Sequence, residues 1–183
     1  MDLQYPVGKF VWGRSGEGLL ATETERQAWI TEIEQAPASL RAALAGLTEA
    51  QIDTPYRPGG WTVRQVVHHL ADSHLNAYVR FRLALTEDQP TIKPYDQQLW
   101  ANLSDARTAP VQLSLTLFDS LHQRFVLLLR SMRPEDFART LKHPEMGLVV
   151  LEKYLAMYAW HGKHHVAHIT GLRERSGWKS QAA

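Results

Sequence analysis

The side chains of this chain with the greatest capacity for chemistry are its histidines, nine in 183 residues, with no cysteine present. His161 and His165 are four residues apart, so on a helix their rings share one face and can converge on one ion. Two imidazoles do not complete a coordination sphere, and the pair His68 and His69 is the evident source of a third ligand. The spacing therefore predicts one divalent metal ion held between two helices.

A site of three histidines holds a zinc-like ion at about 2.0–2.1 Å and leaves a fourth position for water or substrate, as catalytic sites do. Neutral ligands leave the charge of the ion uncompensated, so bound water can ionise near pH ~7. Alone, the H-x-x-x-H spacing is weak evidence, because packed or exposed histidines often show it; the second cluster strengthens it. Gly162 stands where H-E-x-x-H metalloproteases have glutamate, so a peptidase is not indicated.

Helical geometry favours His69 over His68 as the third ligand. His69 shares its stripe with polar residues bordered by Val66 and Leu70, which fits a lined cavity. The polar residues of this stripe are Gln65, Asp72, Ser73, Asn76 and Arg80. His68 has more apolar neighbours, which fits packing or a surface edge. His68 nevertheless stays open as the alternative.

Five further residues, in addition to the proposed ligands, are open to a functional or a plain interpretation. His164 and His168 could fix the tautomer of a ligand or could simply be capped or solvent-facing, and His74 is expected to be a packed helix histidine. Tyr154 and Tyr158 could position substrate, although aromatic residues at helical spacing are more often core.

The two charged residues of the stripe are equally ambiguous. Arg80 could bind an anionic substrate group, but a surface arginine in a salt bridge is the more common case. Asp72 could orient a histidine or take a proton, but helix carboxylates are usually structural. No residue is assigned as a catalytic acid or base on this evidence.

Four helical segments supply the elements that must position these side chains. The first begins near Thr22, with Glu25 completing a capping box, and Pro37 is expected to kink or break it. The second begins after Thr62 and runs to about Thr86. A proline-marked connection of residues 87–110 follows, long enough to be a lid or binding loop.

The third helix is predicted over residues 111–132 and the last over residues 151–175, with Gly177 at its C-terminal stop. An extended turn at residues 143–147 precedes the last helix. One face of the third helix is predicted to be buried by Leu113, Leu117, Leu121, Phe125 and Leu128. The chain is thus expected to be an all-α four-helix bundle with a long loop between its second and third helices.

Length and composition exclude several classes of function. A single domain over residues 1–183, at 20.8 kDa, is the expectation. Lys and Arg total 20 and Asp and Glu 19, a net charge of +1, so no nucleic acid or acidic membrane is expected as a partner. The N-terminus lacks the features of a signal peptide and no apolar run could span a bilayer, which predicts a cytoplasmic protein.

Long motifs place the chain beside a known family. The segments GGWTVRQVVHHLADSH (59–74) and YAWHGKHHVAHI (158–169), with YPVG (5–8) near the start, resemble the YfiT branch of the DinB-like superfamily. The resemblance implies an up-down-down-up four-helix bundle, usually a homodimer, that binds zinc or nickel through three histidines. By position in these motifs, the ligands correspond to His69, His161 and His165.

Members of that branch are described as metal-dependent hydrolases, which implies hydrolysis of a small molecule by metal-activated water. Other members of the wider superfamily transfer low-molecular-weight thiols, so a bacillithiol-transferase-like thiol S-transferase is the first alternative. In that case the ion would lower the pKa of a bound thiol instead of water. The second alternative is a non-catalytic metal-binding module, which a closed site with a fourth protein ligand would indicate.

Overall fold

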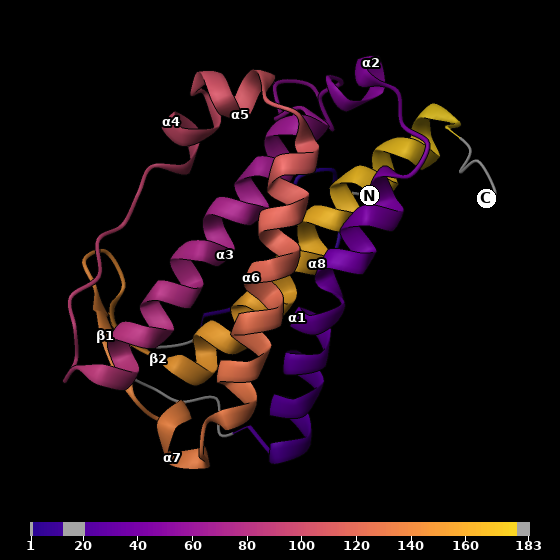
Figure 1. Cartoon of the computed structure of the whole chain (residues 1–183). Coiled ribbons are helices and arrows are strands. Elements are labelled where there is room, and N and C mark those ends of the chain that lie inside the picture. The colour runs from indigo at the N-terminus through magenta and orange to yellow at the C-terminus, as the bar shows by residue number, and fades with distance from the viewer. Residues whose placement is uncertain (1, 13–20, 179–183) are drawn as a thin grey trace.

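The computed structural model describes residues 2–12 and 21–178, and four long helices dominate it (Figure 1). These helices are α1 (Glu23–Leu44), α3 (Val63–Thr86), α6 (Val111–Ser131) and α8 (Leu151–Ser176). In Figure 1, α1 and α8 run upward, and α3 and α6 run downward. The predicted all-α bundle and its up-down-down-up order are confirmed.

The remaining elements are short and lie at the two ends of the bundle. Four are helices of a single turn: α2 (Glu49–Ile52), α4 (Gln97–Ala101), α5 (Ser104–Thr108) and α7 (Pro134–Phe137). The other two are strands, β1 (Thr140–His143) and β2 (Gly147–Val150), which form an antiparallel hairpin immediately before α8. This hairpin is the extended turn that the sequence predicts. None of the helices in the described ranges is long and apolar enough to cross a membrane.

The long connection between α3 and α6 follows from the topology. Because these neighbouring helices are parallel, the chain must return along the bundle before α6 can start, over about 36 Å for the 24 residues of α3. The returning segment is not a featureless loop, since α4 and α5 form within it. Its start is held to the hairpin by paired backbone bonds: Ile92 donates to Lys142, and Lys142 donates to Pro90.

The predicted helix ends are correct. Thr22 and Glu25 form the expected capping box of α1, and Thr62 and Gln65 form that of α3. Helix α8 ends at Gly177, whose φ of +66° is in the left-handed region that glycine adopts without penalty. Capping is local chemistry, which is why the sequence alone locates these ends.

Of the predicted kink or break at Pro37, the break is wrong, because α1 continues through it. A proline within a helix has no N–H to give to the carbonyl four residues earlier, which here is that of Ile33. The carbonyl of Ile33 instead accepts a hydrogen bond of 2.8 Å from Nδ1 of His122 on α6. The proline is therefore tolerated because another helix supplies the missing donor.

The predicted buried face of α6 is partly wrong. Leu121 and Phe125 are buried, but Leu113 is 65% exposed and Leu117 is 45% exposed. The side chains that α6 buries are Leu115, Phe118, Leu121, His122, Phe125, Val126 and Leu129. A polar histidine lies within this stripe, so a search for apolar residues alone selects a face rotated away from the core.

Candidate metal centre

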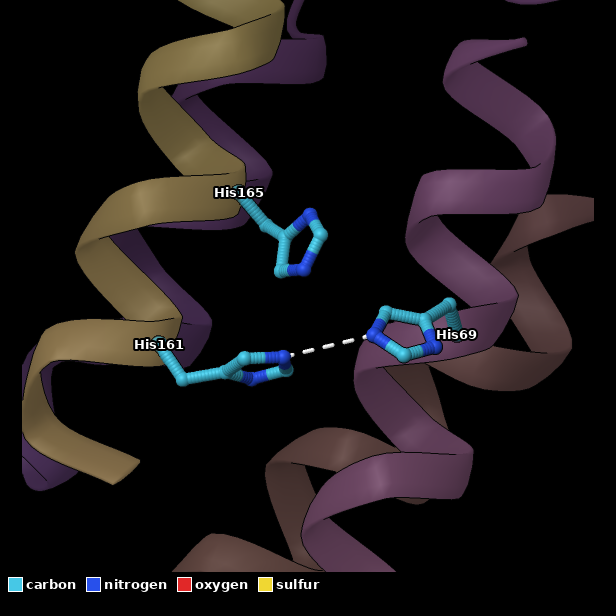
Figure 2. A group of neighbouring side chains, drawn as sticks. All are labelled: His69, His161 and His165. Atoms are coloured by element: carbon cyan, nitrogen blue, oxygen red, sulfur yellow. Dashed lines mark hydrogen bonds between the residues drawn. The ribbon is translucent and has the colours of Figure 1, made fainter. Parts of the chain in front are cut away.

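Three of the predicted residues come together between α3 and α8. His69 extends from α3, and His161 and His165 extend from successive turns of α8 toward it (Figure 2). One ligand nitrogen from each ring lies within 4.8 Å of the other two, and all three residues are at most 9% exposed. The distance from Nε2 of His69 to Nε2 of His161 is 3.3 Å.

These distances and this chemistry fit a tetrahedral metal ion. Two nitrogens that are each about 2.0–2.1 Å from one tetrahedral ion must be about 3.3–3.4 Å apart, which is the separation of His69 and His161. The ligand set is three imidazoles with no carboxylate, the set that leaves a fourth position for water or substrate. When bound, such an ion lowers the pKa of its water to near ~7.

Burial keeps the three imidazoles neutral. It lowers the pKa of His69 to about 3, and it holds the pKa values of His161 and His165 well below the usual value, with neighbouring histidines adding to the effect. A histidine must be deprotonated to bind a metal ion. At neutral pH the three ligand nitrogens are therefore available without the release of protons.

His68, the alternative to His69, is engaged elsewhere. It is also buried, but its Nδ1 lies 2.7 Å from the hydroxyl oxygen of Ser114, and its Nε2 lies 3.1 Å from the carbonyl oxygen of Ala109. Both of its ring nitrogens therefore have partners outside the cluster. The structure brings His69, not His68, to the other two histidines.

His161 lies at the end of a chain of hydrogen-bonded histidines that crosses the bundle. Its Nδ1 is 3.2 Å from Nε2 of His74, and Nδ1 of His74 is 2.9 Å from Nε2 of His122. The chain ends where Nδ1 of His122 meets the carbonyl oxygen of Ile33. His74 is thus more than the packed histidine that the sequence indicates, and His122 is a residue that sequence reasoning missed.

The carbonyl at the end of this chain sets every tautomer along it. A carbonyl only accepts, so the proton of neutral His122 is on Nδ1 and its Nε2 accepts from His74. His74 then accepts on Nε2 from Nδ1 of His161, which leaves the lone pair of His161 on Nε2, facing His69. The signal in the sequence is Pro37, four residues after Ile33, because it frees that carbonyl.

A second, shorter chain holds His165 in the same way. Nε2 of His168 lies 3.1 Å from the carbonyl oxygen of Gln4, so it carries the proton, and Nδ1 of His168 lies 3.3 Å from Nδ1 of His165. His165 therefore donates from Nδ1 and keeps its lone pair on Nε2. The orienting role considered for His168 has this geometry, whereas His164 instead stacks on Trp160 with ring centroids 4.3 Å apart.

The metal centre opens onto a cavity of about 660 Å³, a size typical of small-molecule sites. His161 and His165 form part of its wall, and Tyr154 and Tyr158 continue the same face of α8. The connection between α3 and α6 contributes Tyr95 and its neighbours, as expected of a binding loop. The face of α8 that carries Tyr154, Tyr158, His161 and His165 is therefore a wall of the cavity.

The sequence leaves a catalytic and a structural role open for Asp72, and its position in the structure does not favour the catalytic one. Asp72 is half-buried, and burial raises the pKa of its carboxyl to about 6, but it does not line the cavity. Among the described residues that do line it, Glu145 on the hairpin turn is the single carboxylate. Gly162, at the metalloprotease glutamate position, packs where α1 and α8 meet, and a Cβ there would lie 3.3 Å from that of Ala36.

The chain is similar to known proteins over nearly its whole length. Residues 32–169 match the DinB superfamily. A protein of Bacillus cereus (strain B4264) and one of Bacillus mycoides (strain KBAB4), each named "Putative metal-dependent hydrolase", are both 52% identical to this chain over 97% of its length and 99% of theirs. The solved structure of YfiT from Bacillus subtilis superposes on this chain with a TM-score of 0.92 at 45% identity. The superposition covers 98% of this chain and 100% of that one. YfiT is described as "a probable metal-dependent hydrolase with an unusual four-helix bundle topology". The chain belongs to the DinB superfamily.

Proposed function

We propose that this protein is a hydrolase of a small molecule that uses water activated on one divalent ion bound by His69, His161 and His165. The observation that supports this most is the convergence of three buried, neutral imidazoles, two of which, those of His161 and His165, form part of the wall of a large cavity. Zinc is the expected ion, because three nitrogen ligands with an open fourth position are its usual catalytic set. Nickel is the alternative. The names of the relatives point to the same class of activity.

Residues of this chain would orient the reaction in two ways. The hydrogen-bonded histidines behind His161 and His165 fix the direction of their lone pairs. The hydroxyls of Tyr95 and Tyr158 remain neutral, because burial raises the pKa of Tyr95 to about 12 and raises that of Tyr158 above its usual value. As neutral donors on the cavity wall, they can hydrogen-bond a substrate oxygen.

The activity is tested with zinc-loaded protein and a panel of simple esters and amides in buffer free of thiols. We expect the zinc-loaded protein to turn over at least one compound of the panel. Removal of the metal with a chelator should lower the rate about tenfold or more, and added zinc or nickel should restore it. A parallel panel of electrophiles is assayed with a low-molecular-weight thiol. Turnover that appears only with the thiol would replace hydrolysis by thiol transfer, and stoichiometric metal without turnover in either panel would indicate a binding module.

We also propose that the protein is a homodimer, as the family resemblance implies. Leu113 and Leu117 on α6, together with Leu127 on the same helix, are exposed apolar side chains that a second copy could cover. Sedimentation equilibrium at micromolar concentration is expected to give twice the chain mass of 20.8 kDa. A monomer mass across that concentration range would contradict the dimer.

A further inference from the structure

Arg80 on α3 is a buried cation that has no anionic partner among the residues that the structure describes. It is 9% exposed and lines the cavity, whereas its sequence context favours an arginine in a surface salt bridge. Among residues 2–12 and 21–178, no carboxylate lies within 4.0 Å of its guanidinium. Its contacts are a hydrogen bond of 3.5 Å from Nη1 to the hydroxyl of Tyr158, and the ring of Tyr154, whose centroid is 5.9 Å from Cζ.

Arg64, another buried arginine on the same helix, shows the carboxylate partners that Arg80 lacks among the described residues. Arg64 is 5% exposed and is neutralised by two carboxylates, with Asp53 at 2.7 Å and Glu49 at 2.6 Å. Because a guanidinium cannot lose its proton in a protein, a buried arginine must find a negative partner or bear the cost of desolvation. Arg80 finds none in the described chain, and its remaining N–H groups are left for whatever fills the cavity.

The groups beside Arg80 are also suited to an anion. The hydroxyl of Tyr154 is buried and has no hydrogen-bond partner within the described part of the chain. Burial raises the pKa of Tyr154, and Arg80 only partly offsets this, so the phenol stays a neutral donor. His143 on the hairpin also lines the cavity, and burial followed by the charge of Arg80 lowers its pKa, which keeps that imidazole neutral.

We propose that Arg80, with the hydroxyls of Tyr154 and Tyr158, forms a subsite for an anionic group of the substrate, a carboxylate or a phosphate. Tyr158 joins this subsite to the metal centre, since its hydroxyl contacts Arg80 and its ring centroid is 6.0 Å from that of His161. The substrate class is therefore a small anionic molecule whose negative group lies about one tyrosine ring from the bond that is cleaved. The statement about the cleaved bond rests on the proposed hydrolase function, whereas the proposal of an anion subsite is independent of it.

The subsite is tested by calorimetric titration of inorganic phosphate and, separately, acetate into the zinc-loaded protein. Binding of at least one anion is expected, and Arg80→Gln is expected to weaken it at least ~10-fold, because a charge-assisted, bidentate contact is lost. The stronger ligand identifies phosphate or carboxylate as the preferred group. Arg80→Lys keeps the charge but not the planar fork, and should weaken binding by about threefold or more.

Arg82→Gln is the matched control. Arg82 is on the same helix and donates to a tyrosine hydroxyl, that of Tyr78 at 3.0 Å, but it is exposed and does not line the cavity. This variant should bind the anion within about twofold of the wild type. Circular dichroism and zinc stoichiometry show whether each variant is folded.

A titration on chelator-treated protein separates the subsite from the metal. Binding that survives chelation and is weakened by the Arg80 variants supports the proposal. Binding that disappears on chelation but is unchanged in Arg80→Gln places the anion on the metal and overturns it. So does the absence of measurable binding by the wild type. Because no turnover is measured, a failure of the hydrolase assays does not affect the result.

Discussion

Replacing His161 by alanine is expected to remove the bound metal, and with it all metal-dependent activity, while the bundle remains helical. His161 supplies one of three ligands, and its Nε2 is 3.3 Å from that of His69. Substitution of groups that only support a ligand already costs about 10–100-fold in metal affinity, so loss of the ligand itself should cost more. The substitution also leaves Nε2 of His74 buried without its partner, which should cost about 1–3 kcal/mol of stability.

The measurement is metal content by elemental analysis after dialysis, with circular dichroism as the check of folding. Wild type is expected to retain one zinc per chain, and the double variant His161→Ala/His165→Ala none. His68→Ala is the matched control, because His68 is a buried, hydrogen-bonded histidine next to His69 that does not reach the cluster. It should retain its metal. Stoichiometric metal in the folded double variant would refute the ligand assignment.

Replacing His122 by leucine is expected to weaken zinc binding about 10–100-fold, although the ring of His74 separates His122 from the ligand His161. The substitution removes both the donor to Ile33 and the acceptor for His74. His74 can then adopt either neutral tautomer, so nothing holds the lone pair of His161 on Nε2. Only the fraction of the protein in which His161 has its lone pair on Nε2 can then bind the metal, so the apparent affinity for zinc falls.

The effect is measured by competition with a zinc chelator, together with the ¹⁵N chemical shifts of the His161 imidazole in metal-free protein. Wild type is expected to show the Nδ1-protonated tautomer, and His122→Leu a mixture. His122→Gln should recover much of the affinity, because an amide can donate to one partner and accept from the other in the same sense. His68→Leu is the control for the loss of a buried histidine that makes two hydrogen bonds. Equal affinities for His122→Leu and wild type would refute the tautomer argument.

The predictions that hold depend on local chemistry. The capping boxes at Thr22 and Thr62 and the stop at Gly177 are set by residues a few positions apart. The proximity of His161 and His165 follows from helical spacing alone. The position of His69, rather than His68, beside these two histidines also agrees with a pattern within one helix, the polar stripe on α3.

The predictions that fail depend on contacts between helices. Pro37 reads as a helix breaker until His122 is seen to bond the carbonyl that it frees. The sequence favours a surface salt bridge for Arg80 because the polar stripe of α3 suggests a cavity but cannot show which carboxylates lie within reach of the guanidinium. In both cases a polar group is buried, and the partner that makes this tolerable is on another element or is a ligand.

The central claim is that His69, His161 and His165 together hold one metal ion with an open fourth position. A crystal structure of the zinc-loaded protein, with anomalous difference maps on both sides of the zinc absorption edge, tests this most directly. A single edge-dependent peak is expected between the three Nε2 atoms, about 2.0–2.1 Å from each, with water or solvent density facing the cavity as the fourth ligand. A peak among His164, His165 and His168, or a fourth ligand from the protein itself, would contradict the claim.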